Sequence, residues 1–471
     1  MKLSTEVRRL AFPAILHSLL QTLVFVVDRV MLGRHGGSSL AAMQLGGAIE
    51  WSIWSVFAAF EVGTIARVGR HVGARDPAAA RRAARLSLAM AAGVGTLLAV
   101  ASPLLLALLP LVARNVSPDA LGEARAYLAV TIAASPVVFV ATITIATLQA
   151  GGDTRTPLAI GIVANVVHVG LNYLLIPVMG ARGAGISTAV TFALEAGLAV
   201  AALMSVARPV SLRRGEETRA GTGTGTGTSE SESESERERE REAWWDEGRK
   251  LAGIAGPAFA ERVLYHVGYV GYVLIIVRLG DAAMAANQSL ISVESICFLS
   301  ADGFGIAAAA LVAQKLGAGE PEAAEKVARI GARDAMVALT LFGVTALALR
   351  GVILPMFSHD PEVLAIGRAA MPVLTVAQPF MAAGIVLAQS LRGAGRTREA
   401  LGVSVIGAVM VRLSATWLLA ITLGFGLTGV WMGSTLDWIV RSILLALIGR
   451  RTSARAAAER AVLARGARLP P

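Results

Sequence analysis

Twelve long apolar segments constrain what this chain can fold into. They cover approximately residues 10–33, 40–66, 86–110, 127–149, 157–179 and 183–206, and then 251–277, 283–313, 335–355, 371–391, 400–423 and 427–449. A helix needs about 20 apolar residues to cross the roughly 30 Å hydrocarbon core of a bilayer. Only 16% of the residues are charged, against roughly 25% in soluble domains. The sequence therefore predicts an all-α membrane protein with twelve transmembrane helices in the lipid bilayer.

The formal net charge of +10 comes from basic residues that lie between the apolar segments. One cluster, formed by Arg67, Arg70, Arg75, Arg81, Arg82 and Arg85, follows the second segment, and others follow the eighth, the tenth and the last. Loops with an excess of Lys and Arg are typical of the cytoplasmic side. We therefore expect a multi-pass protein of the inner (cytoplasmic) membrane with both termini in the cytoplasm, and no binding of nucleic acid.

The two halves of the sequence repeat each other. A shift of 244 positions aligns Pro13 with Pro257, Gln44 with Gln288 and Glu50 with Glu294, and a one-residue slip later aligns Pro136 with Pro379. Each half holds six segments, so both halves enter the membrane from the same side and form parallel repeats related by an axis along the membrane normal. Transporters of this design bind substrate between the halves near the bilayer midplane. The architecture therefore indicates transport.

The repeat defines the expected domains: a six-helix bundle over residues 1–207, a linker over 208–250, a second six-helix bundle over 251–450 and a basic cytoplasmic tail over 451–471. The linker consists largely of Gly-Thr, Ser-Glu and Arg-Glu dipeptides. Such a composition has no apolar face to bury. We expect a disordered cytoplasmic linker, which is either a passive connection or a charge-sensing tether.

Ionisable side chains inside the membrane are costly and mark functional sites. Asp28 lies about eighteen residues into the first segment, which places it beyond the midplane, toward the outside. A carboxylate in such a place can exchange protons near neutral pH. The alternative is that Asp28 only pairs with Arg29 or Arg34 at the outer interface.

Asn165, His168 and Asn172 in the fifth segment are spaced i, i+3 and i+7, so they share one helical face. A polar stripe on an apolar helix either lines a cavity or forms hydrogen bonds that hold helices together. Both readings stay open.

The second half has its own set of ionisable residues in apolar segments: Glu261, Arg262, His266, Glu294, Asp302, Arg412, Asp437 and Arg441. Glu50 and Glu294 occupy matching positions of the repeat, which favours a structural role for both. His17 aligns with Glu261, and His168 aligns with Arg412 if the register returns to 244, as the match of Tyr173–Leu175 with Trp417–Leu419 suggests. The halves therefore differ in charge type at two matching positions, as expected if one half handles a cation and the other shapes a substrate site.

The sequence does not indicate an enzyme. A phosphate-binding loop of the form G-x-x-x-x-G-K-[ST] is missing, and the single cysteine, Cys297, excludes an intramolecular disulfide and a cysteine-based metal site. We expect no cofactor, and energy from a proton or sodium gradient.

Several motifs resemble those of the multidrug and toxic compound extrusion (MATE) transporters. They are Phe25–Gly33 with Ser39–Ala42 at the first segment, Gly256–Ala258 with Glu261 and Arg262 at the seventh, Ala285–Gln288, Glu294 with Ser295 and Gly303–Ala307 at the eighth, and Leu391–Gly395 after the tenth. The resemblance covers both halves. It implies a V-shaped pair of six-helix bundles that expels cationic or amphipathic drugs or toxic metabolites in exchange for protons or sodium ions.

The resemblance also implies roles for individual residues. Asp28 matches the family's cation-coupling aspartate, His168 and Asn172 stand where an asparagine and an aspartate often join it, and Thr188 matches a later threonine contributor. Losing the second carboxylate disfavours sodium, which would bind near Asp28, because hard cations prefer several oxygen ligands. A histidine that can itself protonate fits proton coupling. With Asn165, these residues form the expected cation-coupling site, and we expect a monomer.

Candidates for the substrate cavity are Glu50, Glu261, Arg262, Tyr265, Gln288, Glu294 and Arg412. The alternative function is a flippase for lipid-linked precursors from the same wider superfamily, whose cavity would use cations such as Arg262 and Arg412 to hold a pyrophosphate. A membrane scaffold or receptor is a more distant alternative.

Overall fold

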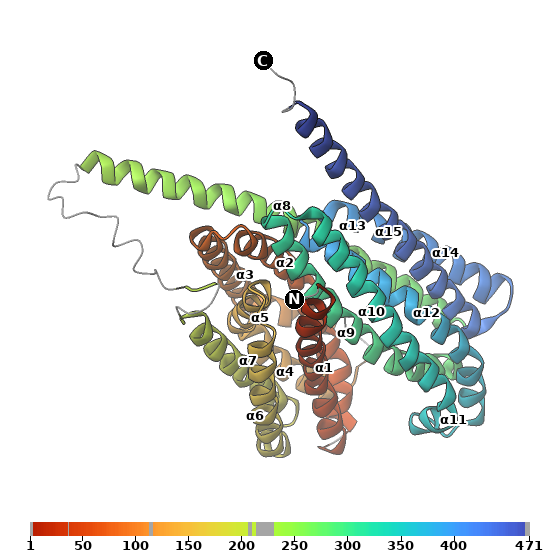
Figure 1. Cartoon of the computed structure of the whole chain (residues 1–471). Coiled ribbons are helices and arrows are strands. Elements are labelled where there is room, and N and C mark those ends of the chain that lie inside the picture. The colour runs from red at the N-terminus through yellow and green to blue at the C-terminus, as the bar shows by residue number, and fades with distance from the viewer. Residues whose placement is uncertain (1–2, 36, 113–115, 206–209, 213–229, 467–471) are drawn as a thin grey trace. The chain divides into compact units, whose positions relative to one another are not determined.

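The computed structural model describes residues 3–35, 37–112, 116–205, 210–212 and 230–466, and every regular element within these ranges is a helix (Figure 1). The Gly-Thr repeat of the expected linker, residues 221–228, lies outside the described residues, as do the last five residues of the expected tail.

The helices of the first half coincide with the six expected spans. In chain order they are α1 (Leu3–His35), α2 (Gly37–Gly73), α3 (Pro77–Val112), α4 (Pro118–Ala133), α5 (Ser135–Ala150), α6 (Arg155–Met179) and α7 (Ala181–Leu203). The fourth expected span is the pair α4–α5, whose axes meet at 54°. Pro136 lies in the first turn of α5 and cannot donate a backbone hydrogen bond to α4. Gly95 of α3 passes this bend closely, since a β-carbon there would lie 2.5 Å from Pro136 Cα.

The second half follows the same plan with more irregular helices. It consists of α8 (Glu230–Val277), α9 (Asp281–Gly317), α10 (Pro321–Ala348), the short α11 (Arg350–Ile353) and η2 (Leu354–Met356), α12 (Pro361–Gly393), α13 (Thr397–Ser404), the π-helical η3 (Val405–Val411), α14 (Arg412–Trp417), the π-helical η4 (Leu418–Thr422) and α15 (Gly426–Gly466). The eleventh expected span is therefore one continuous rod, α13 to η4, with two π-helical stretches. Such stretches are frequent at functional sites.

Nine helices in the described part of the chain are long and apolar enough to cross a membrane, and the bent pair α4–α5 makes a tenth. The helices α1 and α2, with 33 and 37 residues, are also long enough to span. Together they account for the twelve predicted spans.

The chain divides into two compact units. The N-terminal unit is Leu20–Gly256, and the C-terminal unit consists of Met1–Leu19 and Pro257–Pro471. The boundaries fall within α1 and α8, the first helix of each half, so residues 1–19, which the repeat groups with the first bundle, cluster with the C-terminal unit. An ion pair between Arg8 and Asp334 of α10 holds this part of α1 (2.7 Å).

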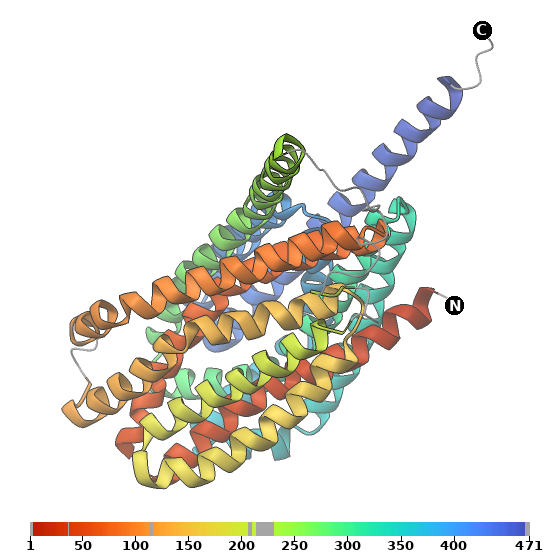
Figure 2. The same cartoon turned by 90° about the vertical axis from the view of Figure 1, so that its left-hand side faces the viewer.

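Within the N-terminal unit, α6 packs along α7, and α3 runs beside the α4–α5 pair (Figures 1 and 2). Its core includes Leu32, Met43, Tyr127, Leu128 and Ile176. These side chains come from α1, α2, α4 and α6, so burial of apolar area holds the helix carrying Asp28 against the helix carrying His168.

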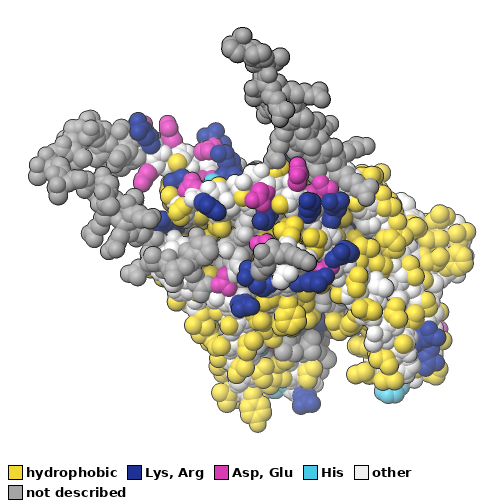
Figure 3. All heavy atoms as spheres, in the orientation of Figure 1, with side chains coloured by type: hydrophobic (Ala, Val, Ile, Leu, Met, Phe, Trp, Pro, Cys, Tyr) yellow, Lys and Arg dark blue, Asp and Glu magenta, His cyan; other side chains and the backbone are white. Residues whose placement is uncertain are grey.

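Within the C-terminal unit, α12 is the central helix and contacts α9, α10 and α15. The largest apolar cluster includes Tyr272, Leu290, Met371, Leu374 and Trp431. Figure 3 shows that apolar side chains cover the visible sides of the helices, whereas charged side chains gather at helix ends. A hydrocarbon environment requires this distribution.

Residues 230–250 differ from expectation. They belong to the disordered linker that the sequence predicts, but they form the first turns of α8. Glu and Arg are good helix formers, and one end of this segment is fixed to the N-terminal unit, because Glu247 binds Arg67 of α2 (2.5 Å). The helix therefore has an anchor that the dipeptide pattern does not reveal.

Candidate functional site

The expected cation-coupling residues Asp28, His168 and Asn172 meet in the interior of the N-terminal unit. Asp28 belongs to α1, and His168 and Asn172 occupy successive turns of one face of α6. Their exposed fractions are 1%, 0% and 0%. The polar stripe of α6 is therefore buried against α1 and takes part in interhelical hydrogen bonding.

Both α6 residues contact the same carboxylate oxygen. His168 Nε2 lies 2.7 Å from Asp28 Oδ1, and Asn172 Nδ2 donates to the same oxygen over 2.5 Å. The Asn172 amide nitrogen is also 3.0 Å from His168 Nε2. Among the described residues, Asp28 makes no ion pair with Arg29 or Arg34, so the outer-interface pairing considered from sequence is not the one observed.

The other ring nitrogen of His168, Nδ1, faces Thr191 of α7. His168 Nδ1 lies 3.1 Å from Thr191 Oγ1, whose own hydroxyl donates to the Ser187 carbonyl over 2.7 Å. Because the single hydroxyl proton is used there, Thr191 accepts a hydrogen bond from Nδ1–H of His168. Thr191 was not among the expected site residues, although its spacing from Thr188 on α7 places both on one helical face.

This network allows two hydrogen-bond arrangements for the pair. With Nδ1 of His168 protonated, Nε2 carries a lone pair, and the 2.7 Å contact to Asp28 Oδ1 then needs a further proton between the two atoms. With Nε2 protonated instead, His168 donates to Asp28 and Nδ1 accepts from the Thr191 hydroxyl. The arrangement is a buried acid–base pair joined by one hydrogen bond.

Three buried oxygens near these helices accept no hydrogen bond from any described residue: Asn165 Oδ1, Asn172 Oδ1 and Thr188 Oγ1. The Asn165 amide donates to the Gly161 carbonyl of its own helix (2.8 Å) and does not contact Asp28. Unpaired buried acceptors are costly, so these atoms suit water or a hydronium near the pair. Within the described parts of the chain, no three His, Cys, Asp or Glu side chains converge as a metal site.

Glu50 of α2 lies in the same unit and is held by the Tyr127 hydroxyl of α4, which donates to its carboxylate. It is close enough to Asp28 and His168 to interact with them electrostatically. Glu50 thus belongs to the surroundings of the pair as well as to the packing of α2 on α4. Its repeat partner Glu294 has a different neighbour, since it lies within electrostatic range of Arg412.

The C-terminal unit contains a buried cluster of one aspartate and two arginines that the sequence predicts only in part. Asp437 of α15 binds Arg412 of α14 (2.8 Å) and Arg441 one turn further along α15 (2.5 Å). The Arg441 guanidinium also stacks on Trp438, 3.9 Å from the ring centroid. All three ionisable residues are recognisable as membrane-embedded charges, but the sequence does not show that one aspartate serves both arginines.

The remaining substrate-cavity candidates do not all gather at one place. Glu261 accepts hydrogen bonds from Arg392 (2.5 Å) and Ser404 (2.6 Å), which ties α8 to α12 and α13. Tyr265 and Arg412 interact electrostatically. Arg262 is half-buried, whereas Gln288 of α9 is exposed.

Comparison with known proteins shows which family this chain matches. The MatE family model matches residues 13–174 and 257–418, which lie in both halves. A probable multidrug resistance protein NorM of Thermotoga maritima is 25% identical over 449 residues, covering 93% of this chain and 90% of the relative. The multidrug resistance protein PmpM of Pseudomonas aeruginosa is 25% identical over 465 residues, covering 96% and 92%.

Solved structures agree with the fold. An outward-facing multidrug resistance MATE family transporter of the MOP superfamily aligns with a TM-score of 0.84 at 16% identity, over 97% of both chains. A MOP superfamily transporter from Pyrococcus furiosus aligns with a TM-score of 0.82 at 17% identity, again over 97% of both. The expected all-α membrane fold of two six-helix bundles is confirmed.

Proposed function

Because this chain belongs to the MatE family of multidrug transporters, we propose that it is a secondary active antiporter that exports cationic or amphipathic small molecules, drugs or toxic metabolites, in exchange for protons. The observation that carries the proposal is the buried Asp28–His168 pair, in which a carboxylate and an imidazole, two groups able to exchange a proton, lie 2.7 Å apart. A group that must hold a proton in one state and can release it in another is what proton exchange needs.

Loss of the proton would change the hydrogen bonds that join three helices. Without it, Asp28 Oδ1 and His168 Nε2 repel each other unless the imidazole moves its remaining proton to Nε2. In that tautomer Nδ1 becomes an acceptor, so Thr191 turns its hydroxyl from the Ser187 carbonyl to the ring. Protonation thereby selects between two hydrogen-bond arrangements that link α1, α6 and α7, and alternating access requires a two-state element of this kind.

The geometry favours protons over sodium. The two atoms that contact Asp28 Oδ1 are nitrogens, His168 Nε2 and Asn172 Nδ2, and no second carboxylate contacts it among the described residues. Hard cations prefer several oxygen ligands. We propose that the transporter needs no cofactor and draws on the proton gradient, where one charge crossing about 100 mV supplies about 2.3 kcal/mol.

We further propose that the protein works as a monomer in the inner (cytoplasmic) membrane with both termini in the cytoplasm, since the basic loops lie on that side by the positive-inside rule. The flippase alternative is disfavoured by Arg412, which is engaged by Asp437 (2.8 Å). An arginine that is buried (9% exposed) and already ion-paired inside the unit is poorly placed to bind a pyrophosphate.

The test is Asp28→Asn in proteoliposomes with an imposed pH gradient. We expect drug transport and drug-dependent collapse of the gradient to be lost, because an amide cannot carry the proton. Glu195→Gln is the matched control, since Glu195 of α7 is also a buried carboxylate of the N-terminal unit (4% exposed). Transport in the control should persist, and replacing sodium by choline should leave the rate nearly unchanged. Full activity of Asp28→Asn, or loss of transport in choline, would refute the coupling.

A further inference from the structure

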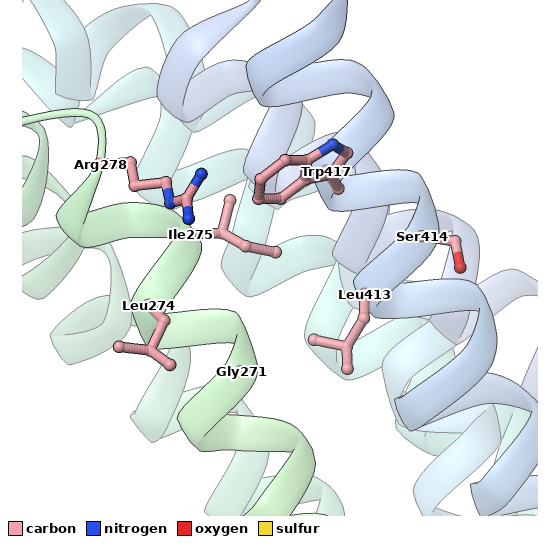
Figure 4. Close-up of a pocket in the computed structure, with 7 residues that line it drawn as sticks. All are labelled: Gly271, Leu274, Ile275, Arg278, Leu413, Ser414 and Trp417. Carbon is pink, nitrogen blue, oxygen red and sulfur yellow. The ribbon is translucent and has the colours of Figure 1, made fainter.

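A groove lies between α8 and α14 of the C-terminal unit. Its volume is about 640 Å³, and it is lined by Gly271, Leu274, Ile275, Arg278, Leu413, Ser414 and Trp417. Figure 4 shows Leu413 facing α8 across from Gly271, with Arg278 and Trp417 together at the other end. The groove has a volume typical of sites for small molecules, about 300–1,000 Å³.

Two glycines let α8 pack closely on the helix opposite. A β-carbon at Gly271 would lie 3.3 Å from the Leu413 side chain, and one at Gly268 would lie 3.5 Å from the Ala408 carbonyl. Seven residues beyond Gly271 along the chain, the groove lining reaches Arg278, the residue directly after α8.

The end of the groove formed by Arg278 and Trp417 combines a charged and an aromatic side chain. The Arg278 guanidinium carbon lies 4.8 Å from the centre of the Trp417 ring. Arg278 is exposed, and within the described residues it forms no hydrogen bond or ion pair, so its N–H donors are available. Trp and Arg at the end of an apolar helix are typical of the depth of lipid headgroups.

An exposed apolar stripe leads from this end along α8. Val267, Val270, Leu274 and Val277 are spaced i, i+3, i+7 and i+10, and all are exposed, from 47% at Val277 to 63% at Val267. Ten residues of helix rise about 15 Å, which is half of the roughly 30 Å hydrocarbon core. The stripe therefore has the length of the acyl region of one leaflet.

We propose that this groove binds an anionic phospholipid, with its phosphate at Arg278 and an acyl chain along the stripe of α8. The charge argues for an anionic lipid, because Arg278 has no acidic partner and a zwitterionic headgroup would bring its own cation close to the guanidinium. Trp417 lines the same end of the groove as Arg278. This site is separate from the Asp28 pair, and it does not depend on which ion drives transport.

Native mass spectrometry of the purified full chain tests the proposal. The protein is titrated with phosphatidylglycerol and with phosphatidylcholine of the same acyl chains. A basic residue near a membrane surface contributes about 1 kcal/mol to anionic lipid binding, so Arg278→Gln should weaken phosphatidylglycerol binding about fivefold and leave phosphatidylcholine unchanged. Arg182→Gln is the matched control, because Arg182 is an exposed arginine in the first turn of α7 in the other unit.

A second variant separates the groove from general charge. Leu274→Trp adds an indole ring at an exposed position of the lining and should weaken the binding of both lipids. Inorganic phosphate at millimolar concentration should not displace phosphatidylglycerol, because it has no acyl chain. The proposal is overturned if Arg278→Gln leaves phosphatidylglycerol binding intact, if Arg182→Gln weakens it equally, if Leu274→Trp has no effect or if free phosphate competes.

Discussion

The contact between Glu247 and Arg67 makes a quantitative prediction about how α8 is anchored. Arg67 donates to the Glu247 carboxylate through Nη2 (2.5 Å) and Nε (2.8 Å), and His71 Nε2 lies 3.4 Å from the same carboxylate. Arg67 and Glu247 are only 9% and 7% exposed. A two-point contact of this kind combines two charge-assisted hydrogen bonds, each contributing about 1.5–3 kcal/mol.

The substitution Glu247→Gln keeps the shape of the side chain and removes its charge. The Arg67 guanidinium then stays buried beside His71 without a counter-charge, and breaking a buried pair in this way costs about 3–5 kcal/mol. Water reaches this part of α8 more easily than the apolar part, which begins at Leu251, so we expect a loss of about 2–3 kcal/mol in the free energy of unfolding of the N-terminal unit.

The neighbouring residue provides the control. Asp246 forms an i,i+4 ion pair with Lys250 (2.5 Å), but both side chains are more than half exposed. Exposed pairs of this type contribute about 0.3–0.5 kcal/mol, so Asp246→Asn should be nearly silent. The two variants remove a carboxylate charge at adjacent positions, one buried in a two-point contact with Arg67 and one exposed beside Lys250.

Equilibrium unfolding in detergent micelles measures the effect, with the fluorescence of Trp244 and Trp245 reporting on this part of α8. A double-mutant cycle with Arg67→Gln isolates the pair, and its coupling should reach about 2 kcal/mol. The reasoning fails if Glu247→Gln and Asp246→Asn destabilise equally, or if the coupling is below about 0.5 kcal/mol.

Two further predictions concern packing and the proton pair. Gly393→Ala should destabilise the fold by about 1–3 kcal/mol and lower the unfolding temperature, because the new β-carbon would lie 2.3 Å from a backbone carbonyl of α9. The control Gly402→Ala should leave the unfolding temperature unchanged, because nothing lies within 4 Å of its new carbon. Equal melting curves for the two variants would contradict this prediction. Thr191→Val removes the acceptor of His168 Nδ1–H, which costs about 1 kcal/mol, so the rate of proton-driven transport should fall about fivefold. In the control Thr142→Val the lost hydroxyl bonds only within its own helix, and a similar loss there would remove the special role of Thr191.

The spans were predictable because they depend on local chemistry, but four helices begin 9 to 14 residues before the expected spans. Apolar length selects membrane-spanning helices regardless of their partners. Four helices, α3, α4, α10 and α12, begin at a proline, Pro77, Pro118, Pro321 and Pro361, where the missing N–H costs nothing and the fixed backbone angle suits the first turn. The sequence displays such signals directly.

The contacts between side chains of different helices were harder to predict than the helices themselves. Spacing placed His168 and Asn172 on one face of α6, whereas the expectation that this face meets Asp28 came from the family resemblance and not from the spacing. The same limit applies to Asp437, which the sequence marks as a charge in the membrane without showing that it serves Arg412 and Arg441. A helical face is local information, whereas the rotation of one helix against another depends on the whole core.

The repeat itself explains why the proposed proton chemistry is confined to one half. At the shift of 244 positions, Asp28 corresponds to Tyr272 and His168 to Arg412. In the C-terminal unit the Arg412 guanidinium lies 5.7 Å from the Tyr272 ring centre, so the matching positions meet there too. Arginine does not release its proton in proteins, and this second pair therefore cannot take part in a proton cycle. One half keeps the exchangeable proton, and the other places a permanent cation at the matching position, which pairs with the buried Asp437 that Arg441 also contacts.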